Sequence, residues 1–160
     1  MTPSAPWAKT WLKRSLGGAA GHFFLLALVH QIDFRWPGLY IYFDVPSNGY
    51  QDQLISLLAF GWAVLFFSAS KASESLKEWS LAVLIAGLGG VLGLCWINAT
   101  NDFSQLTQAA DPIVYWLETA GLAVYLGWLG FLHQYAFLPR PESGLSLQVT
   151  LAPTSPEGHV

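Results

Sequence analysis

Titratable side chains inside long apolar stretches are the residues of this sequence best suited to chemistry. Glu118 follows Pro112 by six residues in one such stretch, and His30 lies toward the end of another. A charged side chain in mid-bilayer costs at least about 2.5 kcal/mol, so it normally faces protein or water. If the two stretches form neighbouring helices, Glu118 and His30 lie at similar depths. We therefore expect the carboxylate and the imidazole to form a pair.

Further polar side chains are expected near this pair. Asp33 and Asp52 lie closer to one membrane surface, and Ser56 and Asn98 lie at about the level of the pair. Together they form a hypothetical, outward-facing pocket for an ion or substrate, which consists of His30, Asp33, Asp52, Ser56, Asn98 and Glu118. The simpler interpretation is one interhelical hydrogen bond that fixes the register of the helices.

Two other histidines, His22 and His133, are expected at similar depths near the opposite surface. Imidazoles on neighbouring helices can ligate a haem b axially, and the glycine cluster around Gly17 would leave room for the macrocycle. An ordinary hydrogen bond near each helix end is the alternative.

A divalent metal is a further alternative. His30 and Asp33 are three residues apart, and Asp52 or Glu118 could complete a set of nitrogen and oxygen ligands. The sequence contains no HExxH or CxxC motif that would specify the metal. Cys95 lies in an apolar context that favours an inert thiol. The sequence therefore predicts no catalytic residue and does not favour an enzyme.

The composition indicates where these side chains are placed. Of 160 residues, 53% are hydrophobic and 11% are charged, whereas soluble domains carry about a quarter charged residues. The lipid bilayer is therefore the expected environment. Seven Lys and Arg residues are too few to neutralise a nucleic-acid backbone, and one Cys cannot form an internal disulfide.

Four apolar stretches are long enough to cross about 30 Å of hydrocarbon, which requires about 20 helical residues. We predict an all-α integral membrane protein with four transmembrane helices in an up-down bundle. The spans fall at about 15–36, 50–70, 76–98 and 112–138 within a membrane domain of residues 15–138. The first two spans reach the required length only if residues 30–36 and 50–53 are helical.

Two segments flank the predicted membrane domain. Residues 1–14 combine Trp7 and Trp11 with basic side chains, which is typical of a segment along the membrane interface. Residues 139–160 are rich in proline and small polar residues, so we expect a flexible tail. The aromatic loop at about 34–49 is expected to fold back on the membrane surface or on the mouth of the bundle, as an aromatic belt or a lid.

Local patterns mark where three helices should begin. A side chain that accepts a hydrogen bond from the first turn, together with a partner three residues on or a following proline, is a helix-start signature. The matching pairs are Asn48 with Gln51, Ser75 with Glu78, and Asp111 with Pro112.

Basic residues beside the spans predict the orientation, because Lys and Arg are retained on the cytoplasmic side. Only Arg35 falls on the opposite side from the other Lys and Arg residues. Both termini are therefore expected in the cytoplasm, and the membrane is expected to be the cell (inner or plasma) membrane.

The predicted last span has a second face that suggests a partner. Ala120, Ala123 and Gly127 are small residues at helical spacing, and Glu118 lies roughly 160° away around the helix. One helix thus has two faces unsuited to lipid, so we expect a homo-oligomer or a larger membrane complex. We predict a small accessory or interaction subunit. The alternatives are a proton-coupled transporter or permease that uses Glu118, and a haem- or metal-dependent redox protein.

Overall fold

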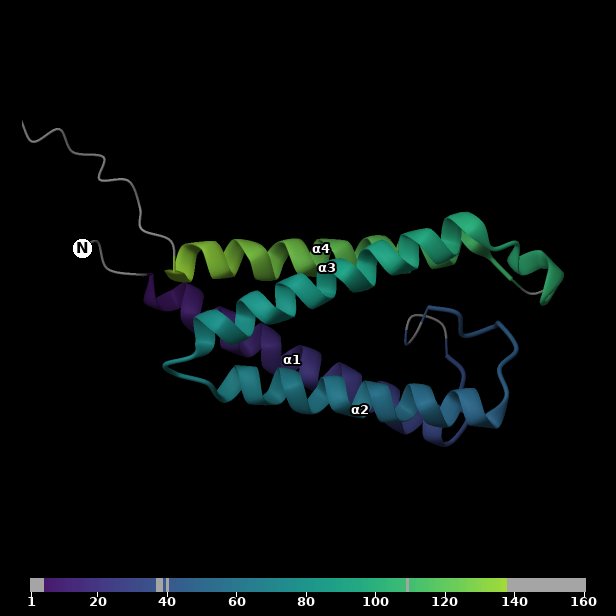
Figure 1. Cartoon of the computed structure of the whole chain (residues 1–160), viewed down its shortest axis with the longest axis horizontal. Helices are drawn as coiled ribbons and strands as arrows, with labels where there is room; N and C mark the ends of the chain where they lie inside the picture. Colours follow the sequence, from purple (N-terminus) through teal and green to yellow (C-terminus); the bar gives the residue numbers. More distant parts are fainter. Residues whose placement is uncertain (1–4, 37–38, 40, 109, 138–160) are drawn as a thin grey trace, which may run out of the picture.

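The structure is a computed structural model that describes residues 5–36, 39, 41–108 and 110–137. It contains four α-helices, α1 (Pro6–Gln31), α2 (Gly49–Lys71), α3 (Leu76–Thr100) and α4 (Pro112–Phe137), with a short 3-10 helix, η1 (Phe103–Gln105), before α4 (Figure 1). The described residues form no strand. The all-helical prediction is therefore confirmed.

The helices form two hairpins that diverge toward one end. α1 packs mainly on α2 and α3 mainly on α4, whereas α1 and α4 touch less and α2 and α3 least. The hairpins converge where α1 begins and are far apart where the loop between α1 and α2 lies (Figure 1). The apolar core lies at the converging end and includes Ala8, Leu12, Leu16, Ala69, Leu76, Leu132 and Ala136.

Three of the helices, α2, α3 and α4, are long and apolar enough to cross a membrane. This is the property expected of an integral membrane protein. α1 is equally long, but its first half carries Lys9, Lys13 and Arg14. Its role as a fourth span, and the orientation of the two termini, stay predictions.

The helix α1 differs from its predicted form at both ends. It begins at Pro6, so the basic residues before position 15 form the first turns of the same helix. These turns pack into the core through Ala8 and Leu12, which are fully buried. Residues 1–4 and the predicted tail at 139–160 lie outside the described residues.

The helix α1 ends at Gln31, and the expectation that it continues to residue 36 is wrong. Asp33 adopts a left-handed conformation with a φ of 50°, which Asp tolerates better than most residues. The N–H of Phe34 then donates to the carbonyl of Val29 at 2.9 Å. This bond closes the helix end in the manner of a Schellman motif.

Two of the three predicted helix starts are confirmed. At α2, Gln51 N–H donates to Asn48 Oδ1 at 2.9 Å, and Asn48 N–H donates to Gln51 Oε1 at 3.1 Å. At α4, Ile113 N–H donates to Asp111 Oδ1 at 3.0 Å. The capping box predicted at Ser75 is wrong, because its side chain makes no cap hydrogen bond. Its ψ of 15° departs from the extended backbone that a capping side chain requires.

Candidate functional site

A buried polar contact joins α1 to α2 at the end where the hairpins diverge. His30 Nδ1 lies 3.1 Å from Asp52 Oδ1, and both residues are more than nine-tenths buried. Small residues along the seam let the two backbones approach, and Ser56 Oγ donates to the carbonyl of Ala27 at 2.8 Å. The seam thus fixes the register that places Asp52 opposite the imidazole.

The loop between α1 and α2 closes over this pair. Ser47 Oγ lies 2.8 and 3.0 Å from the two carboxylate oxygens of Asp52. Arg35 donates to Ser47 Oγ at 3.1 Å and to Asp33 Oδ1 at 3.1 Å. A cavity of about 170 Å³ remains, and its lining includes His30, Asp33, Arg35, Ser47 and Asp52. We call these five residues the polar cluster.

The same loop also contacts the other hairpin. Tyr42 OH donates to Asn98 Oδ1 at 2.6 Å, and Asn98 Nδ2 donates to Thr119 Oγ1 at 3.0 Å. Tyr115 OH donates to Asp44. Burial raises the pKa of the Tyr42 phenol, which keeps it a donor. The loop therefore bridges the two hairpins where they diverge.

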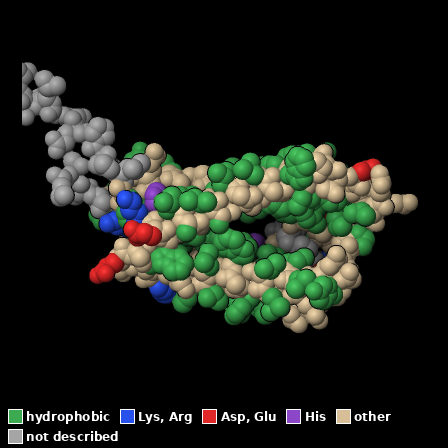
Figure 2. Space-filling model, in the orientation of Figure 1, with side chains coloured by type: hydrophobic (Ala, Val, Ile, Leu, Met, Phe, Trp, Pro, Cys, Tyr) green, Lys and Arg blue, Asp and Glu red, His purple; other side chains and the backbone are tan. Residues whose placement is uncertain are grey.

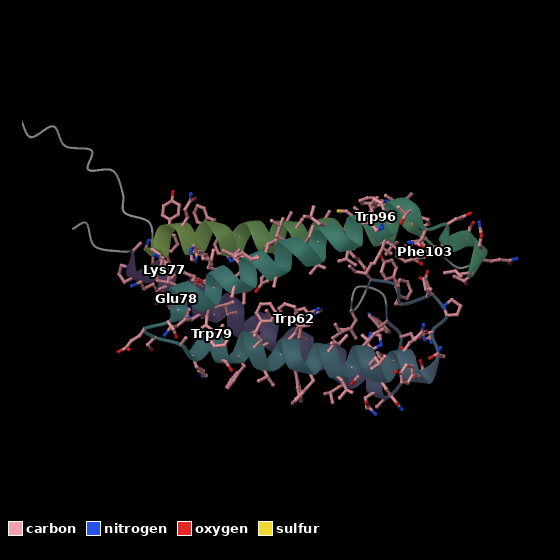
Figure 3. All side chains as sticks on the ribbon, viewed as in Figure 1. Trp62, Lys77, Glu78, Trp79, Trp96 and Phe103 are labelled. Carbon is pink, nitrogen blue, oxygen red and sulfur yellow. The ribbon has the colours of Figure 1, made fainter. Side chains whose placement is uncertain are left out.

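Aromatic packing reinforces this bridge. The Tyr42 ring stacks on Phe103 with 5.1 Å between centroids and meets Tyr115 edge-on at 5.1 Å. Phe103 lies between the end of α3 and the loop (Figure 3). The expectation that the aromatic loop folds back on the bundle agrees with these contacts.

The structure distributes the predicted pocket residues over two places. His30, Asp33 and Asp52 line one cavity, and Ser56 lies one helical turn beyond Asp52. Asn98 does not line this cavity and instead contacts Tyr42 and Thr119. Glu118 is half-buried on α4 beside Thr119. The acid that the structure places against His30 is Asp52, whereas the sequence analysis expected Glu118.

The two histidines considered for haem have ordinary surroundings. His133 Nδ1 lies 2.7 Å from Ser80 Oγ. His22 is exposed, and its ring meets that of the adjacent Phe23 edge-on at 5.8 Å. Within the described ranges, no group of three or more His, Cys, Asp or Glu residues is placed to hold a metal. The metal set considered for His30 is therefore not assembled there.

An apolar cavity that sequence reasoning missed lies between the hairpins. It measures about 280 Å³, and Figure 2 shows a hollow between the two hairpins. Trp62 points from α2 toward the other hairpin (Figure 3), while Gly87 and Gly90 form part of the opposite wall on α3. Phe23 and Phe66 stack at 5.3 Å on the α1–α2 side. No single sequence pattern marks a cavity assembled from all four helices.

Comparisons with known proteins found no match for this chain among protein-family models, curated proteins or solved structures.

Proposed function

We propose that the protein is a non-catalytic accessory subunit of a membrane complex and contacts its partner through α4. In this proposal all four helices span the membrane and both termini lie in the cytoplasm. The observation that carries it is the outward face of α4, where the small residues Ala120, Ala123 and Gly127 are all exposed.

Two glycines of the α3–α4 hairpin have different surroundings. A Cβ at Gly87 would lie 2.7 Å from Leu126 Cδ1, so the absence of a side chain at Gly87 makes room for the end of the Leu126 side chain between α3 and α4. A Cβ at Gly127 would meet nothing within 4 Å. Glycine lowers helix stability by about 1 kcal/mol relative to alanine. Close approach of another transmembrane helix gives Gly127 a structural role.

The polar cluster supports a structural role for the buried charges. Asp52 contacts both His30 and Ser47, and Ser47 in turn accepts a hydrogen bond from Arg35. These contacts hold the loop against α1 and α2, while Tyr42 and Asp44 hold it against α3 and α4. Because the loop holds the two hairpins together, α4 presents a fixed face to a partner.

The test compares two substitutions on the same helix. Gly127→Leu fills the proposed interface, whereas Val124→Leu enlarges a residue that is 74% exposed beside it. After solubilisation of native membranes in mild detergent, the wild type and Val124→Leu should co-purify with one fixed set of larger subunits. Gly127→Leu should lose that set while still inserting into the membrane. A monomer without stoichiometric partners, or partner loss in neither variant, would contradict the proposal.

A proton-coupled transporter is the second candidate, and the buried His30–Asp52 pair favours it. A carboxylate and an imidazole that line a cavity can exchange a proton. The half-buried Glu118 on α4 would supply a further proton-binding group. In sealed proteoliposomes, this function requires a proton flux that Asp52→Asn and Glu118→Gln each abolish. The accessory role predicts no flux above that of empty vesicles.

A further inference from the structure

We propose that a groove between α1 and α2 binds an anionic glycerophospholipid. One acyl chain lies along the groove, and the phosphate contacts Arg14 and Lys71 at the basic end of the bundle. This site is distinct from the α4 face and from the polar cluster.

The groove is apolar and has room for a ligand. It measures about 390 Å³, with a floor of small residues and walls of aromatic and branched side chains. Its lining consists of Gly17, Ala20, Gly21, Phe24, Phe60, Ala63, Val64 and Phe67. A Cβ at Gly21 would meet nothing within 4 Å, and one at Gly17 would only touch Ser70 Cβ at 4.0 Å. Internal packing therefore does not require glycine at either position.

Helical periodicity continues both walls of the groove into basic side chains. Residues three and four apart share a helix face. On α1, Arg14 and Lys13 precede Gly17 by three and four residues. On α2, Lys71 follows Phe67 by four residues. The groove thus ends between cations from both of its helices.

Both cations pack on aromatic rings, and the ring beneath Lys71 belongs to the groove. Lys71 Nζ lies 5.3 Å from the centroid of the Phe67 ring, which forms part of the groove wall. The Arg14 guanidinium lies 5.3 Å from the Trp11 ring. Basic side chains gather at this end of the bundle (Figure 2).

In the described part of the chain, neither Arg14 nor Lys71 forms an ion pair with an acidic side chain. Glu74 and Glu78 lie in the turn before α3 and in its first residues. The ion pairs within the described part of the chain are His30–Asp52 and Arg35–Asp33, which lie at the opposite end. The positive charge of Arg14 and Lys71 is therefore available to an anion.

A lipid matches both the apolar groove and the cations at its end. The groove offers no set of polar partners that would hold water, so it favours hydrocarbon. Basic side chains at a membrane surface each attract anionic lipid by about 1 kcal/mol. Free phosphate would contact only the cations, and a zwitterionic lipid would gain little from them. Both parts together therefore favour a lipid whose headgroup carries net negative charge.

The experiment measures lipid binding to the full-length protein in a non-ionic detergent by native mass spectrometry. Phosphatidylglycerol and phosphatidylcholine are titrated separately, and the thermal unfolding midpoint is followed in parallel with inorganic phosphate as a third ligand. Phosphatidylglycerol should bind preferentially and raise the midpoint. The double substitution Arg14→Gln and Lys71→Gln should weaken its binding about 30-fold, whereas Lys77→Gln should change it by less than about threefold.

A second pair of substitutions tests the acyl chain. Gly21→Leu fills the groove, whereas Gly18→Leu adds the same side chain one turn nearer the basic end, at a position outside the groove that also has nothing within 4 Å. Only Gly21→Leu should displace the lipid. Equal binding of the two lipids, equal stabilisation by phosphate alone, or lipid binding unchanged in Gly21→Leu would overturn the proposal. So would a protein helix found cross-linked in the groove in place of lipid.

Discussion

The two ends of the bundle use their charges differently. At the diverging end, Asp52 is buried against His30, and the exposed Asp33 pairs with Arg35. At the converging end, Arg14 and Lys71 lie against aromatic rings rather than carboxylates. In the first arrangement, the ionisable groups contact one another and hold the loop and helices together. The second leaves charge at the surface, where it can recognise a ligand.

The same distinction applies to glycines. Gly87 lies where a Cβ would meet the end of the Leu126 side chain on α4, so its lack of a side chain is used in packing within the chain. Gly21 and Gly127 have open space in that position. The surroundings of each glycine thus separate the one that packing within the chain uses from those that face open space.

The largest effect is expected from breaking the buried pair. Asp52→Ala removes the partner of both His30 and Ser47 and should lower the free energy of unfolding by about 3–5 kcal/mol, because each hydrogen bond to a charged group is worth about 1.5–3 kcal/mol. The control is Asp33→Asn, which breaks an exposed pair at the same end while keeping a side chain that tolerates the left-handed backbone. It should cost less than about 1 kcal/mol. Denaturant titrations in detergent micelles measure both values. Equal decreases in the free energy of unfolding would mean that burial does not determine how much each pair stabilises the protein.

An intermediate effect is expected where glycine permits internal packing. Gly87→Leu should displace the Leu126 side chain, overpack the contact between α3 and α4 and lower the free energy of unfolding by about 1–3 kcal/mol. Gly121→Leu adds the same side chain to α4 at a position with nothing within 4 Å. It should not destabilise the isolated protein in the same titration. A stable Gly87→Leu variant would show that the helices do not depend on this close approach.

A smaller effect is expected from the polar contact between Ser80 and His133. Ser80→Ala removes a hydrogen bond from the converging end and should cost about 0.5–1.5 kcal/mol. Ser104→Ala changes an exposed serine in η1 and provides a control. Thermal unfolding of the two variants should separate them. Equal midpoints would mean that His133 is not fixed by this bond.

The smallest effect concerns pH and the loop. Burial raises the pKa of Tyr42 above its ordinary value of 10.0, so its contribution to stability is complete below pH 10 and is lost as the pH rises through the raised pKa. The unfolding midpoint of the wild type should therefore fall more steeply above pH 10 than that of Tyr42→Phe. Parallel curves for the two proteins would contradict the burial of the Tyr42 phenol.

Regular features of the sequence predicted much of the fold. Low charge and long apolar stretches predict helices that can span a membrane, and the Asn48 and Asp111 patterns locate two helix starts. The break at Asp33 was missed because an apolar stretch with polar ends does not show which residue adopts a positive φ. Ser75 failed as a cap because its backbone, rather than its residue type, is unsuitable.

The site was harder to predict because depth along a helix does not specify the direction of a side chain. His30 and Glu118 have matching depths, but the small residues on the α1–α2 seam bring Asp52 to the imidazole. Ser47 and Arg35 were not predicted to belong to the site because loop residues have no periodicity to place them. Tyr42 could have been noticed as a polar aromatic in a loop expected to fold back.

The central functional claim is that α4 contacts another membrane protein, and photo-crosslinking in native membranes tests it most directly. A photoreactive amino acid is placed at Ala123 on the small-residue face, or at the adjacent Val124. We predict that Ala123 forms a discrete adduct with a larger subunit, whereas Val124 reacts with lipid alone. No protein adduct at Ala123, or an adduct only with a second copy of this chain, would contradict the accessory role.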